Sequence, residues 1–268
     1  TKGNRNEWSL NSFLVFQNMP NGLSPSGFKK IQGAALSIDK NLKNNQSFGL
    51  TLWWDQANQG KQAPSVLEAY TLSQLRNYNP SWGWLDGQAY YPNSKYTNVP
   101  VLSIRYEKSW RDKAILQINF GLAIGEQGTS QLDWTSTADP RPDYYRYLPS
   151  YRKDSSTQSQ LTKWFESNPQ ALQINFDRIQ KINTASVSKR SFYIINKNSA
   201  NIILGRASAL YKLEINNYWS TNAGIQIAKD KIHYFNIIEN LLGGQFYYNY
   251  NGWVIDDGLV NSFQNNIQ

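Results

Sequence analysis

The sequence lacks residue types that several common classes of protein require. It has no cysteine among its 268 residues, so it can form neither a disulfide framework nor a thiolate metal site. Its one histidine, His233, has no second histidine or cysteine with which to hold a metal ion, and no catalytic triad can be built around it. No stretch approaches the roughly 18 consecutive apolar residues of a membrane-spanning helix.

Charge is also scarce, and its pattern argues against nucleic acid as a partner. Only 17% of the residues are charged, although the net charge is +8. Lysines and arginines are scattered singly and form no stripe or run, so we expect no nucleic-acid binding. Asp139 and Asp143 lie in a proline-rich stretch beside Arg141 and Arg146, where ion pairs that brace the loop are the expected role. We therefore expect no enzymatic activity, no cofactor and no metal site.

Aromatic residues are abundant instead, at 14% of the chain with 10 Trp and 17 Tyr. This abundance fits a carbohydrate-binding surface, and it fits equally well the aromatic girdles at the two edges of a membrane barrel. The pattern of the strands has to distinguish the two.

Apolar and polar residues alternate with a period of two along several segments, which is the pattern of a strand between two different environments. In the stretch 114–125, Leu116, Ile118 and Phe120 fall on one side, and Gln117 and Asn119 fall on the other. The sequence predicts strands near residues 9–17, 31–40, 48–58, 99–109, 114–125, 202–215 and 220–230.

Short turns alternate with long connections along the chain. The long connections span residues 60–97, 128–200 and 236–268, and short helices are expected in them near 65–76, 159–167 and 171–182. This arrangement, with charged residues in mid-strand on the polar faces, is typical of an antiparallel transmembrane β-barrel with long extracellular loops. We therefore predict an all-β chain that forms a barrel segment, while a soluble sheet with one solvated face also produces such alternation.

The sequence predicts a ligand vestibule in the loops. Segments 79–91 and 139–151 are rich in aromatic residues and arginine, and both lie on the long-loop side of the hairpins, so we expect them to meet above one rim. For Trp82 and Trp84, packing within the loop is the alternative role. The candidate ligand-binding residues are Trp82, Trp84, Tyr144, Tyr145 and Arg146.

Five stretches within these loops resemble a known family. In chain order they are NPSWGWLDGQ (79–88), LDW (132–134), DPRPDYYRYLPSY (139–151), INFDRIQKIN (174–183) and LLGG (241–244). Together they resemble the extracellular loops of a group of TonB-dependent outer-membrane receptors, and the resemblance covers about residues 27–250.

The resemblance implies a location and a set of partners. Members of that family are barrels of about 22 strands with an N-terminal plug, and they import scarce nutrients with energy delivered through TonB. This sequence shows no plug, no TonB box and too few strands, so we expect an open, curved sheet whose first and last strands are unpaired within it. The implied partners are outer-membrane lipid of a Gram-negative bacterium, the remaining strands and plug, the TonB complex through that missing part, and a nutrient ligand with or without a surface lipoprotein. The alternative function is a secreted, aromatic-rich β-sandwich that binds glycans.

Overall fold

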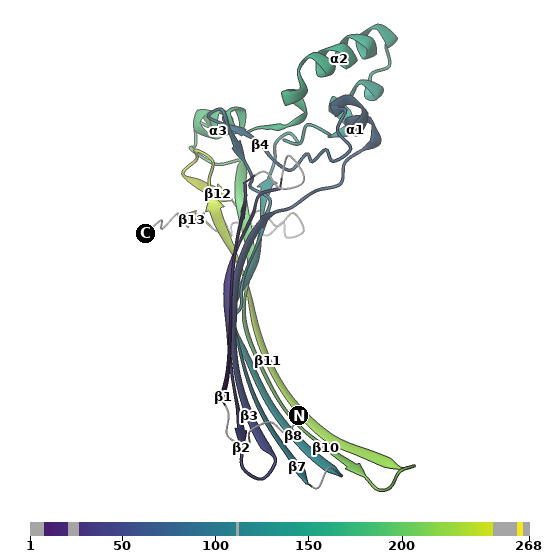
Figure 1. Ribbon diagram of the computed structural model, residues 1–268. Helices are drawn as coiled ribbons and strands as arrows, with labels where there is room; N and C mark the ends of the chain where they lie inside the picture. Colours follow the sequence, from purple (N-terminus) through teal and green to yellow (C-terminus); the bar gives the residue numbers. More distant parts are fainter. Residues whose placement is uncertain (1–7, 21–26, 111–112, 249–261, 265–268) are drawn as a thin grey trace.

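The computed structural model describes residues 8–20, 27–110, 113–248 and 262–264, and most of it is one large antiparallel sheet (Figure 1). Strands account for 57% of the structure, and the sheet curves into a partial ring, which confirms the all-β prediction. A folded cap of short helices and small strands lies at one end of the sheet, and the hairpin turns lie at the other (Figure 1).

Eight strands form the large sheet, in the order β1-β2-β3-β6-β8-β10-β11 with β7 between β3 and β8. β6 and β7 lie end to end, both between β3 and β8, and Pro100 lies between them in the chain. Proline has no backbone N–H to donate to a ladder, so an interruption is expected there. The strands are β1 (Trp8–Met19), β2 (Lys29–Leu42), β3 (Gln46–Gly60), β6 (Ser94–Asn98), β7 (Val101–Trp110), β8 (Ala114–Trp134), β10 (Tyr193–Glu214) and β11 (Ser220–Asn240).

Several strands extend further than the sequence pattern indicated. The connection expected at 128–200 has strand residues at both ends, since β8 continues to Trp134 and β10 begins at Tyr193. The connection expected at 60–97 contains most of β6, and β11 continues to Asn240. In these extensions the two faces carry similar side chains, polar or glycine at 127–130 and apolar at 193–195, so the alternation that reveals a strand is lost.

The large sheet is open at both edges in the described residues. β1 pairs with β2 alone, and β11 pairs with β10 alone. This confirms the prediction of an open, curved sheet with unpaired outer strands. The backbone groups along these two edges remain available to further strands.

The two faces of the sheet differ in chemistry. Directly opposed residues share a face in an antiparallel ladder, so the register Leu50–Ile104–Phe120–Ala207–Ile227 forms one apolar row across five strands. The rows above and below it are also mostly apolar. We call this side the apolar face, and the opposite side, which carries Gln117 and Asn119, the polar face.

The apolar face is bounded along the strands. On β8 the apolar run extends from Leu116 to Ile124, about nine residues or roughly 26 Å along the strand, and Glu126 follows. At the end with the turns, rings and lysines mark its border. The rings of Trp110 and Tyr211 lie 6.4 Å apart there. Lysine ammonium groups lie over two indoles, Lys40 over Trp8 at 4.3 Å and Lys108 over Trp110 at 4.9 Å.

The cap is built from the long connections between the strands. Its helices are α1 (Leu67–Ser73), α2 (Ser155–Ser167) and α3 (Phe176–Ala185), and no helix among the described residues is long and apolar enough to cross a membrane. The helix expected at 171–182 is divided, because Asn175 caps α3 by accepting a 2.8 Å hydrogen bond from the Arg178 amide. The small strands are β4 (Gly83–Leu85), β5 (Gln88–Tyr90), β9 (Ile174–Asn175), β12 (Phe246–Tyr248) and β13 (Ser262–Gln264).

The buried core of the described chain lies mainly in the cap and not on the large sheet. Phe176 and Leu172 are 0% exposed, whereas Leu14 and Ile227 on the apolar face are 81% and 66% exposed. Buried Asn183 ties the cap together: its amide nitrogen donates to the carbonyls of Tyr193, Leu241 and Leu242 at 2.8–3.0 Å. Its oxygen accepts from the amides of Phe192 and Tyr193. The cap is thus folded around a core that it shares with the adjoining ends of β8 and β10.

Candidate functional site

The connections that form the cap contact one another through specific hydrogen bonds. Ser65 donates to the Asp143 carboxylate at 2.7 Å, and the Tyr78 hydroxyl donates to the Leu172 carbonyl at 2.7 Å. The pKa of Tyr78 is raised by its burial. The β3–β6 and β8–β10 connections therefore meet at one end of the sheet, through residues that flank segment 79–91 and through Asp143 of segment 139–151.

Trp82 and Trp84 lie together in the cap, where they pack against other rings. Their ring centroids are 5.2 Å apart, and Trp82 also stacks on Tyr91 at 5.5 Å. Between them, Gly83 pairs with Ile174, so close that a Cβ on Gly83 would lie 1.8 Å from the Ile174 carbonyl oxygen. Because Trp82 is only 9% exposed, little of its ring remains for a ligand, which favours packing as its role.

Tyr144, Tyr145 and Arg146 form a second group, in which Tyr145 and Arg146 are exposed and Tyr144 is half-buried. The ring of Tyr145 lies 4.8 Å from that of Tyr144 and 5.5 Å from that of Tyr151, and Tyr145 is 49% exposed. The Arg146 Nε donates to the Tyr145 hydroxyl at 3.0 Å, and this hydrogen bond lowers the pKa of Tyr145. An exposed cluster of tyrosines around a guanidinium offers stacking surfaces and hydrogen-bond donors together.

The structure does not bring these two groups into ring contact within the part of the chain that it describes. Tyr144 contacts Tyr145 and Tyr147, while Trp82 contacts Trp84 and Tyr91. Tyr145 and Arg146 are exposed to a ligand, whereas Trp82 is buried and Trp84 is half-buried.

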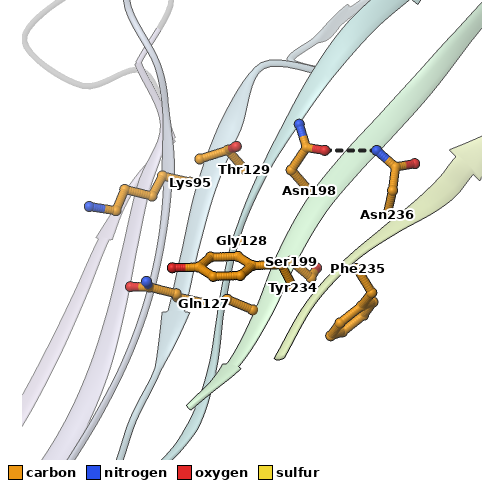
Figure 2. Close-up of a pocket in the computed structure, with 10 residues that line it drawn as sticks. Lys95, Gln127, Gly128, Thr129, Asn198, Ser199, Tyr234, Phe235 and Asn236 are labelled. Carbon is orange, nitrogen blue, oxygen red and sulfur yellow. Dashed lines mark hydrogen bonds between the residues drawn. The ribbon is translucent and has the colours of Figure 1, made fainter. Parts of the chain in front are cut away.

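A hollow of about 630 Å³ lies on the sheet below the cap, where β6, β8, β10 and β11 meet (Figure 2). Asn236 donates to the Asn198 side-chain oxygen at 2.7 Å across β10 and β11, and the Tyr234 ring is 75% exposed beside them. Polar side chains of the polar face, Lys95, Gln127 and Thr129 among them, complete the lining (Figure 2). The hollow can offer amide, hydroxyl and ammonium groups to a ligand.

The sequence analysis missed this hollow because its residues fall where connections were expected or at their borders. Gln127 and Thr129 alternate with Gly128 and Ser130, all small or polar, so no contrast between faces marks a strand. The signal that could have found them is the recurrence of uncharged polar residues at every second position in both β8 and β10.

The polar face of the large sheet carries ion pairs between strands. Arg105 contacts Asp39 at 3.0 Å, and Arg206 contacts Asp230. Gln117 donates to the Glu107 carboxylate at 2.9 Å. These charges are satisfied by their neighbours on the same face, so the polar face suits an aqueous environment.

The acidic side chains of the described residues are not gathered into a metal centre. These residues contain no group of three or more His, Cys, Asp or Glu side chains that could hold a metal ion. Asp139 holds Arg141 at 2.6 Å, and Asp143 accepts from Ser65, so both carboxylates brace the loop.

Comparison with known proteins gives no assignment: no family model, no curated protein and no solved structure matches this chain.

Proposed function

We propose that this chain forms part of the wall and the ligand-receiving cap of an outer-membrane β-barrel receptor in a Gram-negative bacterium. The apolar face would contact lipid, the polar face would line the interior, and the cap would lie outside the cell. The resemblance of the cap segments to TonB-dependent receptors supports nutrient import as the activity of the whole assembly.

The uncovered apolar face is the observation that carries this proposal. Side chains such as Leu14, Phe16, Ile225 and Ile227 are 65–81% exposed in one continuous surface. Soluble proteins rarely expose apolar patches beyond a few hundred Å², and larger ones mark contact with a partner or with a membrane. A run of about nine residues in tilted strands matches the thickness of the hydrocarbon layer.

The rival function, a secreted glycan-binding sandwich, requires a second sheet packed against the apolar face. The other two sheets among the described residues have strands of only two or three residues, and they belong to the cap region. The buried hydrophobic clusters also lie mainly in the cap, around Phe176 and Leu148. This arrangement favours the barrel over the sandwich.

The open edges define what the proposed barrel still needs. An unpaired backbone N–H or C=O in lipid costs several kcal/mol, so β1 and β11 must be joined by further strands of this protein or of another subunit. A plug and the contact with the TonB complex would belong to that further part. Within this chain, Tyr144, Tyr145 and Arg146 would contact the arriving ligand.

The topology can be tested by labelling single introduced cysteines, because the chain contains none of its own. Tyr145→Cys lies in the cap, and Tyr218→Cys lies in the β10–β11 turn, where Tyr218 is 93% exposed. The complete protein is expressed in an outer membrane, and a membrane-impermeant maleimide is added to intact cells or to lysed cells. We expect labelling of the cap cysteine in intact cells and of the turn cysteine only after lysis. Equal labelling of both in intact cells, or recovery of the protein in the soluble fraction, would contradict the proposal.

A further inference from the structure

Charged residues are distributed unequally between the two faces of the large sheet. On the polar face, arginines are paired with aspartates, as in Arg206 with Asp230. On the apolar face, the strand register places six lysines and only one glutamate among the regularly paired residues. These residues are Lys30, Lys40, Lys108, Glu126, Lys197, Lys229 and Lys231.

The few acidic groups near β11 on this face are already engaged. Glu126 is held by Lys197 at 3.0 Å, and Glu239, at the bulge near the top of β11, accepts from Ser130 at 2.6 Å. Lys229 and Lys231 have no such partner within the described residues. Two exposed ammonium groups therefore share one face of one strand, about 7 Å apart along it.

The position of this lysine pair is specific. Lys229 lies opposite Gly205, which offers no side chain to cover it, and Lys231 lies opposite Ile203. Ile203 in turn pairs with Ile124, the last residue of the continuous apolar run of β8 on this face. Ile225 and Ile227 precede the pair on β11, so the lysines stand at the border of the apolar band nearest the cap.

We propose that Lys229 and Lys231 bind the phosphate of a lipid headgroup in the leaflet on the cap side of the membrane. This inference rests on the proposed membrane location. Lysine stems extend along apolar surface while the ammonium reaches the headgroup layer, and cations at this depth attract anionic lipids. The unpaired charge at the border of an uncovered apolar band is complementary to such a lipid, whose chains would cover Ile225 and Ile227.

The test uses lipids that carry a photoreactive diazirine on the headgroup. The complete protein is reconstituted in phosphatidylcholine vesicles doped with diazirine-labelled phosphatidylglycerol or, separately, with diazirine-labelled phosphatidylcholine. After illumination, crosslinks are mapped to peptides by mass spectrometry. We expect the β11 peptide to react preferentially with phosphatidylglycerol. The double variant Lys229→Gln with Lys231→Gln should reduce the yield of this crosslink by about fivefold for each lysine removed.

Two internal controls accompany this measurement. Lys212→Gln removes a lysine from the polar face of β10 and should leave the yield at β11 unchanged. The peptide that contains Lys108 should keep its own yield in the double variant. Equal reaction of the two lipids at β11, or a phosphatidylglycerol yield that survives the double substitution, would overturn the lipid site. Loss of labelling on adding inorganic phosphate would show that the lysines bind free phosphate, and would also overturn it.

Failure of the membrane location would look different. A diazirine placed on the acyl chain should label Ile225 and Ile227 in the wild type and in the double variant alike. Absence of that labelling would contradict the proposed function itself. Its presence, together with an unselective headgroup reaction, would contradict the headgroup site alone.

Discussion

If the apolar face contacts lipid, as we propose, a charge placed in its middle should destabilise the protein in proportion to its depth in the membrane. Phe120 stands midway between Leu116 and Ile124, about 13 Å along the strand from either border. With a strand tilt of about 40°, this corresponds to roughly 10 Å along the membrane normal, close to the midplane. We predict that Phe120→Arg lowers the free energy of unfolding by about 2–4 kcal/mol.

Two matched arginine variants separate depth from the general effect of an added charge. Ile124→Arg lies at the border of the band, where the cost falls to about 0–1 kcal/mol. Gln117→Arg lies on the polar face opposite Glu107, which would become an ion-pair partner, so little destabilisation is expected.

The assay is guanidinium unfolding of the complete protein reconstituted in vesicles, followed by tryptophan fluorescence. The reasoning is refuted if Ile124→Arg is as costly as Phe120→Arg, because a dry protein core penalises both positions without regard to depth. It is also refuted if Gln117→Arg is the most costly of the three.

Three further predictions concern the cap. Asn183→Ala leaves two backbone amides without their acceptor and should lower the free energy of unfolding of the cap by about 2–6 kcal/mol. Thr184→Ala, at its exposed neighbour, should lower it by less than about 0.5 kcal/mol, and hydrogen exchange of the cap measures both. Arg146→Leu removes the hydrogen bond that lowers the pKa of Tyr145, so that pKa should rise in an NMR titration of Cζ-labelled tyrosine, and an unchanged value would contradict the contact. Gly83→Ala should break the pairing of β4 with β9, and the amides of both strands should then lose protection from hydrogen exchange. Retained protection would contradict this prediction, because it would mean that the backbone can shift to admit the Cβ while the two strands stay hydrogen-bonded.

The strands could be predicted where the two faces differ in chemistry. In β8 the contrast between Leu116 or Ile118 and Gln117 or Asn119 is clear, and the expected segment coincides with the apolar band. From Glu126 to Gln131 both faces carry polar or glycine residues, so the period-two pattern is lost there, although the strand continues to Trp134. The sequence therefore reveals the apolar band and not the full length of the strand.

The candidate site was harder to predict because exposure depends on contacts between distant segments. Trp82 and Tyr145 are both aromatic loop residues, and nothing local to them separates a buried ring from an exposed one. The difference arises because Trp82 stacks on Tyr91 and adjoins the β4–β9 pairing, whereas Tyr145 lies on a short turn with other tyrosines. Such pairings join residues far apart in the sequence, which a single sequence does not disclose.

The account depends most directly on what surrounds the apolar face, and spin labels can measure it. Single cysteines at residues 116–120 of the complete protein, reconstituted in vesicles, are labelled one at a time, and the accessibility of each label to oxygen and to a water-soluble nickel complex is recorded. The membrane account predicts high oxygen and low nickel accessibility at Leu116, Ile118 and Phe120, with the opposite ratio at Gln117 and Asn119. Labels at the apolar positions that neither reagent reaches would place them in a dry protein core and contradict the account.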